Sequence, residues 1–197
     1  MAEERWLREL VEALGAGRPA SSVPPPEEAP EALANLQPLT AKPVLYVANV
    51  GEGASLEPPS GLPGRTVAVS ARLEAELAEL EAEEADAMRE ALGAEEPGLD
   101  RVVAGAFALL DLITFFTAHD GVEARARAIP RGTSARRAAG AVHTDMERGF
   151  VAAEVVGWEE LLEAGGYAGA RERALLRTEG RDYEVRDGEV VTFRFSR

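Results

Sequence analysis

The stretch Lys42-Pro43-Val44-Leu45-Tyr46-Val47-Ala48-Asn49 is a continuous apolar run that ends in a polar residue. A strand buried on both faces of a parallel sheet has this pattern, because helices cover both faces of such a sheet. A second short strand is predicted over residues 65–70, after a loop rich in Gly, Pro and Ser. The two segments predict an α/β unit with a parallel sheet.

Helical patterns flank these two strands. Residues 3–14 are predicted to form a helix whose apolar stripe is Trp6, Leu7, Leu10, Val11 and Leu14. The proline-rich residues 19–30 then form a connector. After the second strand, one helix is predicted from Leu73 to Leu92. Another begins near Pro97 and carries the apolar positions Leu99, Val102, Val103, Ala106, Leu109 and Leu110.

From Leu112 the sequence pattern changes to short strands. Strands are predicted at 113–117, 123–129 and 150–156, with a helix over 134–143 that begins at Ser134. Asp187-Gly188 between two further strand segments, 183–186 and 189–195, predicts a closing hairpin. These elements indicate a small mixed sheet around one helix, with a domain boundary near residue 111.

Composition and charge exclude several classes of function. The chain has no cysteine, which excludes disulfides and thiolate chemistry, and no apolar run that approaches the length of a membrane span. We therefore expect a cytoplasmic protein with no membrane partner. The net charge of −14 argues against DNA binding. Residues 1–111 carry −13 of it and residues 112–197 only −1, so an RNA-facing surface is expected only in the C-terminal half.

Two polar motifs follow the predicted strands. Asn49-Val50-Gly51-Glu52 comes directly after the first strand, and Ser70-Ala71-Arg72 comes after the second and opens a helix. In open α/β sheets, ligands bind at the carboxyl ends of the strands. An Asn followed three residues later by a carboxylate is similar to Asn-Lys-x-Asp, the base-reading motif of P-loop nucleotide hydrolases. A simple loop in which Asn49 makes a turn is the structural alternative.

Several longer segments carry a family resemblance. Five segments resemble the corresponding segments of YchF-type Obg-like ATPases, namely residues 39–50, 95–101, 131–133, 138–140 and 143–150. Residues 179–183 and the final predicted strand continue the match. The resemblance covers the chain from Leu39 onward. It implies the end of a helical (coiled-coil) arm at residues 1–20, the C-terminal part of a parallel-sheet P-loop nucleotide-binding (G) domain at 31–111, and an α+β β-grasp (TGS, ubiquitin-like) domain at 112–197.

The resemblance also implies a function. Members of this family hydrolyse ATP in preference to GTP and associate with ribosomes, on the large subunit or the 70S particle. By analogy, the purine base is contacted by Asn49, Val50, Glu52, Ser70, Ala71 and Arg72. Glu52 is one methylene longer than the Asp that clamps guanine, and Val50 replaces the Lys that packs along the base. The guanine clamp is therefore not expected in its usual geometry.

The sequence departs from the family in one large respect. It contains no Gly-x-x-x-x-Gly-Lys-Ser/Thr segment, the loop that cradles the phosphates and supplies a Mg²⁺ ligand. We therefore expect no catalytic residue and no hydrolysis by this chain alone, with Mg²⁺ bound only together with the missing half. The chain is read as a piece of a longer protein or as a truncated relative. The alternative function is a non-catalytic ribosome-, RNA- or protein-binding module.

Three other groups have two readings each. His143 beside Asp145 could serve acid–base or metal chemistry, or could hydrogen-bond within its turn. The acidic run 74–90 could bind cations or form a solvated helix face. His119-Asp120-Gly121 is expected to be a surface loop. The arginines 125, 127, 131, 136 and 137 form either a solvated face or a ribosomal RNA contact, for which the candidates are Arg125, Arg131 and Arg137.

Overall fold

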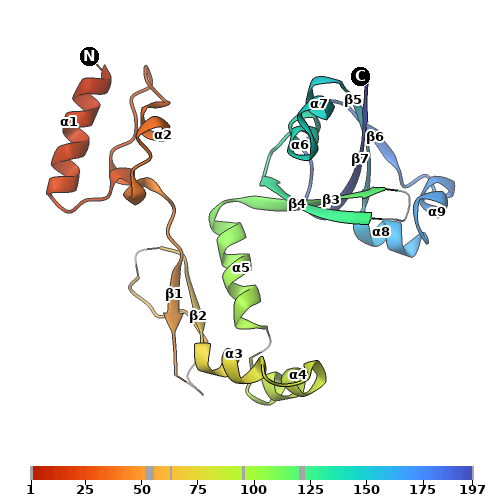
Figure 1. Cartoon of the computed structure of the whole chain (residues 1–197), viewed down its shortest axis with the longest axis horizontal. Coiled ribbons are helices and arrows are strands. Elements are labelled where there is room, and N and C mark those ends of the chain that lie inside the picture. The colour runs from red at the N-terminus through yellow and green to blue at the C-terminus, as the bar shows by residue number, and fades with distance from the viewer. Residues whose placement is uncertain (1, 52–55, 63, 95, 120–122, 197) are drawn as a thin grey trace. The chain divides into compact units, whose positions relative to one another are not determined.

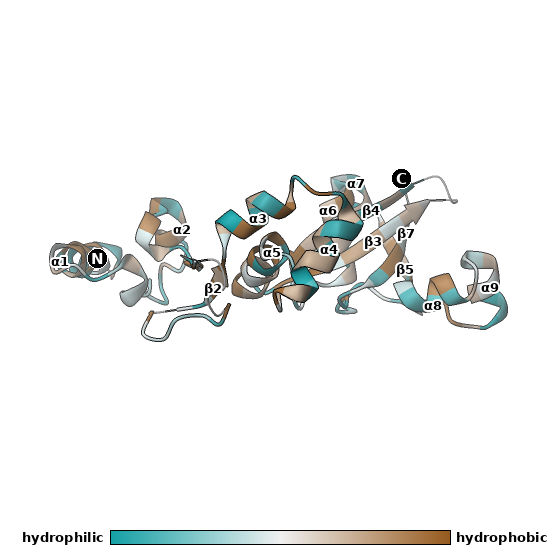
Figure 2. Ribbon diagram, turned by 90° about the horizontal axis from the view of Figure 1, so that it is seen from below, coloured by the Kyte–Doolittle hydropathy of each residue, from teal (hydrophilic) through white to brown (hydrophobic). Residues whose placement is uncertain are grey.

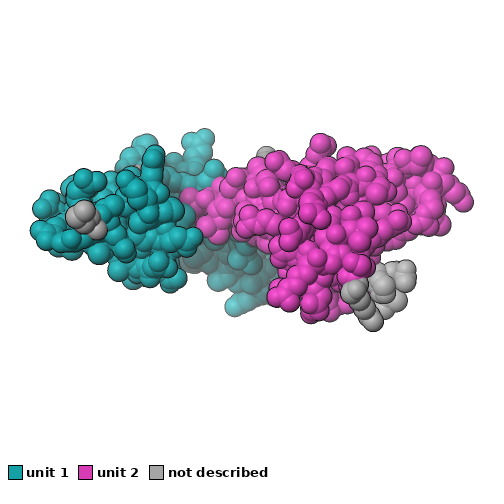
Figure 3. All heavy atoms as spheres, turned by 90° about the horizontal axis from the view of Figure 1, so that it is seen from above, with its two compact units in different colours: residues 1–105 teal, residues 106–197 magenta. Residues whose placement is uncertain are grey.

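The computed structural model describes residues 2–51, 56–62, 64–94, 96–119 and 123–196. The chain is a mixed α/β protein that divides into two compact units, residues 1–105 and 106–197 (Figures 1 and 3). Within the described part of the chain, no helix is long and apolar enough to cross a membrane. Each unit has its own sheet.

Unit 1, residues 1–105, contains a two-stranded parallel sheet among short helices. Its elements are α1 (Ala2–Gly15), η1 (Ala20–Ser22), α2 (Ala32–Leu36), η2 (Leu39–Ala41), β1 (Tyr46–Asn49), β2 (Thr66–Val69), α3 (Ala71–Leu77), α4 (Ala82–Ala91) and α5 (Gly98–Leu109), which carries the unit boundary. Helix α5 packs on this sheet through Gly105, where an added Cβ would lie 3.0 Å from Val67 and 3.3 Å from Leu45.

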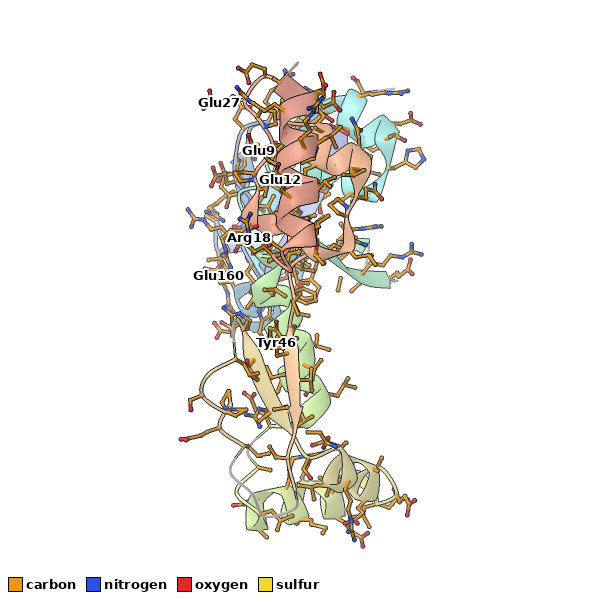
Figure 4. All side chains as sticks on the ribbon, turned by 90° about the vertical axis from the view of Figure 1, so that its left-hand side faces the viewer. Glu9, Glu12, Arg18, Glu27, Tyr46 and Glu160 are labelled. Carbon is orange, nitrogen blue, oxygen red and sulfur yellow. The ribbon has the colours of Figure 1, made fainter. Side chains whose placement is uncertain are left out.

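The predicted helix over residues 3–14 is confirmed as α1, but its apolar stripe is only partly buried. Trp6 and Leu10 pack in a small cluster with η1 and α2, and the Trp6 indole N–H donates to Val23 O at 3.1 Å. Val11 is 69% exposed, because the described chain packs only the Trp6–Leu10 side of the helix. The acidic residues Glu9 and Glu12 are exposed on the same helix (Figure 4).

The prediction of a strand buried on both faces over residues 42–49 is wrong in two respects. The strand begins only at Tyr46, and Val47 within it is 47% exposed. Among the described residues, β1 has one neighbour, the parallel strand β2, so neither face is fully covered. The second predicted strand is confirmed as β2.

The single helix predicted from Leu73 to Leu92 is also wrong, because the chain leaves the helix between Ala78 and Glu81. Leu73 and Leu77 of α3 form one buried cluster with Ala85 of α4 and with Ala94. Folding the chain back brings the two helices into one core, and it interrupts a run of glutamates that would repel one another along a continuous helix. The helix predicted to begin near Pro97 is confirmed as α5.

Unit 2, residues 106–197, is built on a five-stranded sheet. Its elements are β3 (Leu112–His119), β4 (Glu123–Pro130), α6 (Ala135–Val142), α7 (Thr144–Arg148), β5 (Phe150–Gly157), α8 (Trp158–Glu163), α9 (Tyr167–Glu172), β6 (Arg177–Glu179) and β7 (Glu189–Phe195). The strand order is β4-β3-β7-β5-β6, so the last strand of the chain lies in the middle. β7 runs parallel to β3 and antiparallel to β5.

One continuous core fills the side of this sheet that α6 covers. Phe115, Val155 and Val191 from three strands pack against alanines of α6, and the Phe115 and Phe193 rings meet edge-to-face with centroids 6.0 Å apart. Figure 2 colours β3 and β7 largely brown, in agreement with this core. The strands predicted at 113–117, 123–129 and 150–156 and the helix after Ser134 are thus confirmed.

The predicted closing hairpin is wrong. β7 pairs with β3 and β5, and the segment before Asp187 does not pair with it. Instead, the Val185 N–H donates to Thr133 O and the Ala135 N–H to Tyr183 O, so this segment lies beside the chain that enters α6. The Asp187-Gly188 turn is fixed to β3, because Asp187 Oδ1 accepts from the Thr114 N–H at 2.7 Å.

Candidate functional site

The parallel register of β1 and β2 brings two polar strand ends together. Asn49 at the end of β1 is aligned with Val69 at the end of β2. The Val50 N–H continues the ladder and donates to Val69 O at 2.9 Å. Because parallel strands end at the same edge of their sheet, Asn49 and Ser70 lie at one edge of unit 1, as the sequence predicts for a ligand site.

A side-chain hydrogen bond joins the two strand ends directly. The Ala71 N–H donates to Asn49 Oδ1 at 3.1 Å, across 22 positions of sequence. Ser70 is 4% exposed, and its Oγ caps α3 by accepting from the Leu73 N–H at 3.4 Å. Asn49 therefore orients the Ser-Ala turn, and the backbone N–H of Ala71, a residue expected to contact the base, already donates to Asn49.

The other predicted site residues have different surroundings. Val50 is half-buried behind the edge, whereas Arg72 is exposed and its Nε lies 2.9 Å from Glu76 Oε1. Glu52 lies outside the described residues, so the structure gives no position for its carboxylate. The structure thus brings Asn49, Ser70 and Ala71 together.

Two supporting contacts were missed by the sequence reasoning. Glu74 of α3 accepts from the Gly98 N–H at 2.8 Å and so caps the start of α5. Arg101 of α5 donates to Leu56 O at 2.6 Å, which anchors the chain just beyond the Asn49 loop. Arg101 lies in a segment that carries the family resemblance and Glu74 does not, and the spacing of these two residues alone predicted no partner for either.

His143 is a structural residue of its turn. Its Nδ1 accepts from the Asp145 N–H at 3.2 Å at the start of α7, which confirms the interpretation that it hydrogen-bonds locally. The described residues contain no group of three or more His, Asp or Glu side chains that could hold a metal ion.

In the acidic run, Glu83 and Glu84 are exposed. Of the segment His119-Asp120-Gly121, Asp120 and Gly121 lie outside the described residues, and His119 ends β3.

The candidate RNA-binding arginines are spread along unit 2. Arg125 pairs with Glu123 at 2.8 Å and Arg131 with Asp111 at 3.0 Å, and all four side chains are largely exposed. Arg125 and Arg131 are six residues apart along β4 and its end, roughly 20 Å at the rise of a strand. Arg137 on α6 is exposed and has no ion-pair partner within the described ranges.

A buried carboxylate near the end of the chain was also missed. Glu189 is 4% exposed, and its Oε1 accepts from Arg177 Nη2 and from the Tyr183 hydroxyl, each at 2.6 Å. Its Oε2 accepts from the Arg186 N–H at 2.9 Å. Burial of the phenol, together with its hydrogen bond to Glu189, raises the pKa of Tyr183. The signal in the sequence was a glutamate at the head of an apolar strand.

The fold is that of an α/β protein. Two parallel strands end at one sheet edge, where α/β proteins bind ligands and where the polar residues at their ends are hydrogen-bonded to each other, and a separate unit with a mixed sheet follows. Residues 112–196 match the family model YchF-GTPase_C, described as a protein of unknown function (DUF933). The ribosome-binding ATPase YchF of Bacillus subtilis (strain 168) is 42% identical over 202 residues, covering 96% of this chain and 55% of that protein. The chain belongs to the YchF family, of which it represents the C-terminal part.

Other relatives agree with this assignment. The protein of the same name from Escherichia coli O157:H7 is 44% identical over 168 residues, covering 80% of this chain and 46% of that protein. The solved structure of the Schizosaccharomyces pombe YchF GTPase has the same fold, with a TM-score of 0.77 and 24% identity over 98% of this chain and 54% of that one. This chain spans about half the length of the curated relatives it matches.

Proposed function

We propose that the chain is the C-terminal part of a ribosome-associated protein that binds and hydrolyses a purine nucleotide, ATP or GTP. Its relatives are named ribosome-binding ATPases. In this proposal residues 1–20 end a helical arm and residues 31–111 supply the base side of a nucleotide-binding domain. Residues 112–197 form a TGS domain of β-grasp type that faces the ribosome, in the cytoplasm.

The observation that carries the proposal is the bond between Asn49 Oδ1 and the Ala71 N–H. It fixes two motifs that lie far apart in sequence at one strand edge, which is where a base-reading pair has to meet. A simple turn at Asn49 would not need a partner on the next strand. In the proposal, Asn49 presents the rest of its amide to the purine, and Val50, Ser70, Ala71 and Arg72 line the edge.

Base choice is assigned to Glu52 and Val50. A carboxylate accepts hydrogen bonds from the N1–H and amino group of guanine, whereas adenine has an acceptor at N1. A longer Glu52 without the packing Lys weakens the guanine clamp and favours ATP. The residues present do not fit Mg²⁺ or the phosphates, because the described chain holds no cluster of three metal-ligating side chains and the sequence lacks a phosphate-binding loop. This chain alone supplies no hydrolytic step.

The topology of unit 2 supports the β-grasp assignment. Counted within the unit, the sheet order is second, first, fifth, third and fourth strand, with the first and last strands parallel and a helix after the first two strands. This is the arrangement of ubiquitin-like domains. The candidate RNA contacts of this domain are Arg125, Arg131 and Arg137; their replacement by Ala is expected to weaken ribosome co-sedimentation, most strongly at low salt.

Calorimetric titration with ATP and GTP tests the nucleotide site. The chain is joined behind the N-terminal half of the Bacillus subtilis relative and compared with the 197-residue chain alone. We expect the joined protein to bind ATP and the Asn49→Ala variant to lose affinity for both nucleotides by roughly tenfold, the equivalent of about 1.4 kcal/mol. Unchanged affinity in that variant would show that Asn49 does not contact the base.

A second function is favoured by the contacts of the two motifs, because Asn49 Oδ1 already accepts from the Ala71 N–H and Ser70 Oγ already caps α3. The chain would then be a non-catalytic module that binds the ribosome, RNA or a protein, with Asn49 and Ser70 kept for folding only. Co-sedimentation with ribosomes, measured with and without ATP, separates the two functions. Pelleting of the chain that is indifferent to nucleotide, together with a joined protein that binds none, would support the module.

A further inference from the structure

The outer edge of the five-stranded sheet is formed by β4, an eight-residue strand. It pairs along its whole length with β3, from Leu112↔Pro130 to His119↔Glu123, and no other described strand pairs with it. Alternate N–H and C=O groups of such an edge point outward, and they are a template on which another strand can add. β4 is far longer than the opposite edge strand β6, which has three residues.

The two faces of β4 carry different chemistry. Arg125 and Arg127 lie opposite Thr117 and Phe115, on the face that α6 covers. Ala124, Ala126 and Ala128 lie on the other face, and all three are exposed. Side chains of an added strand alternate in the same way. One set would meet guanidinium groups, and the other would lie over methyl groups that leave room for large apolar side chains.

Arg127, which contacts α6, has only some of its hydrogen-bond donors paired. Arg127 Nη1 donates to Ala141 O at 3.0 Å, but its Nε is buried and has no hydrogen-bond acceptor in the described chain. A hollow of about 500 Å³ lies beside Arg125 and Arg127, between Met146 and the end of β7. Both side chains therefore line open space on that side. Because Nε is enclosed, a carboxylate that enters the hollow would pair with Nη2, the terminal nitrogen of Arg127 that does not donate to Ala141 O.

A second copy of this chain fits the edge poorly. An antiparallel pair of β4 strands centred on Ala126, near the middle of the strand, would set Arg125 of one copy against Arg127 of the other, and like charges on paired strands destabilise a sheet. Charge complementarity instead selects an acidic strand. Arg125 already pairs with Glu123 at 2.8 Å, so a carboxylate of the added strand would share Arg125 with Glu123, whereas Arg127 has no ion-pair partner among the described residues.

We propose that β4 is a docking edge for an extended protein segment in which acidic and large apolar residues alternate. The acidic residues contact Arg125 and Arg127, the apolar residues cover Ala124, Ala126 and Ala128, and the backbone continues the sheet. The site is independent of the nucleotide site in unit 1. Arg131 and Arg137, two of the three candidate RNA contacts, take no part in it.

Amide NMR of the nitrogen-labelled 197-residue chain tests this proposal. The probe is a synthetic peptide of alternating Glu and Ile, long enough to span β4. We expect saturable shifts confined to residues 123–130 and the facing part of β3. A peptide of alternating Lys and Ile is the charge control, and a peptide with its Glu and Ile residues in separate blocks is the pattern control; neither should shift these amides.

Three variants assign the contacts. Arg127→Gln keeps a donor for Ala141 O but removes the charge, and it should raise the dissociation constant by roughly tenfold, since a charge-assisted pair is worth about 1–2 kcal/mol. Ala126→Lys should weaken binding through the other face. Arg171→Gln, at an exposed position on α9, is the matched control and should change nothing. Equal binding of the Lys peptide, shifts on β6 instead of β4, or displacement of the peptide by a short single-stranded RNA would overturn the proposal.

Discussion

Unit 2 closes around one core, whereas unit 1 does not. Eleven buried residues from four strands, α6 and the segment before β7 form a single cluster in unit 2. Among its described residues, unit 1 has two separate clusters of four buried residues each, and it carries most of the exposed large apolar side chains, among them Val11, Val44 and Leu99. Apolar burial is the main favourable term in folding, so the two units should differ in how far they fold unaided.

The largest expected effect concerns the units expressed separately. Residues 112–197 should unfold in one cooperative thermal transition, because their core is complete. Residues 1–105 alone should show no such transition, since their two clusters are small and much of their apolar surface is open. Circular dichroism and calorimetry measure both. A cooperative transition in residues 1–105 would remove the contrast between the units.

The second-largest difference between the units should appear when a large apolar side chain is shortened to alanine. Phe115 is fully buried in unit 2, and Phe115→Ala should lower the free energy of unfolding of that unit by about 3–5 kcal/mol. Val11 is 69% exposed on α1, and Val11→Ala should change stability by less than about 0.5 kcal/mol. Urea denaturation of the whole chain, followed by far-ultraviolet circular dichroism, gives both values. Similar losses in the two variants would mean that α1 is covered in solution.

The buried carboxylate should contribute less than the core. Glu189→Ala leaves the Arg186 N–H and the Tyr183 hydroxyl without their acceptor, which should cost about 1–3 kcal/mol. Glu172→Ala, at an exposed position on α9, is the control and should be nearly neutral. Urea denaturation of the two variants measures both changes in the free energy of unfolding. A neutral Glu189→Ala would show that water replaces the lost contacts.

The hydrogen bond between the ends of β1 and β2 in unit 1 should contribute less to stability than Glu189 does. Asn49→Ala removes the acceptor of the Ala71 N–H and should lower the stability of unit 1 by about 0.5–1.5 kcal/mol. Hydrogen exchange of the Ala71 amide should speed up in that variant. An amide that exchanges at the same rate would mean that the bond is not populated in solution.

The smallest effect is confined to alkaline solution. The pKa of Tyr183 is raised, so the folded state holds the phenol proton more tightly than the unfolded state. This contribution is complete below the ordinary tyrosine pKa of about 10 and is lost as pH rises through the folded value. The melting temperature of unit 2 should therefore fall above about pH 10, and Tyr183→Phe should flatten that fall. An identical slope in the variant would assign the pH dependence to other groups.

The sequence predicted the local elements better than their partners. Helices α1, α5 and α6 and the strands β3, β4, β5 and β7 follow from periodicity and helix-start signals, whereas β6 was not predicted. The break after Leu77 could not be foreseen, because no Gly or Pro marks it and packing with Ala94 decides it. Asp187-Gly188 signals a turn, but a turn signal does not say which strands the next segment joins; here that segment is β7, and it joins β3 and β5.

The candidate site shows the same limit. Asn49 and Ser70 were found because each follows a strand and parallel strands end together. The bond from Asn49 to the backbone of Ala71, the Glu74 cap on α5 and the Arg101 anchor at Leu56 join residues that are more than twenty positions apart. Such pairs leave no periodic trace in a single sequence, so only the folded chain reveals them.

The place of β7 in unit 2 has a consequence for synthesis. This strand, the last of the chain, lies between β3 and β5 at the centre of the sheet. During translation the earlier strands emerge first. The edges of β3 and β5 that pair with β7 stay unpaired until residues 189–195 have been made. A nascent chain that stalls before Glu189 therefore exposes two unpaired strand edges, and the unit can close its sheet only after its final residues leave the exit tunnel.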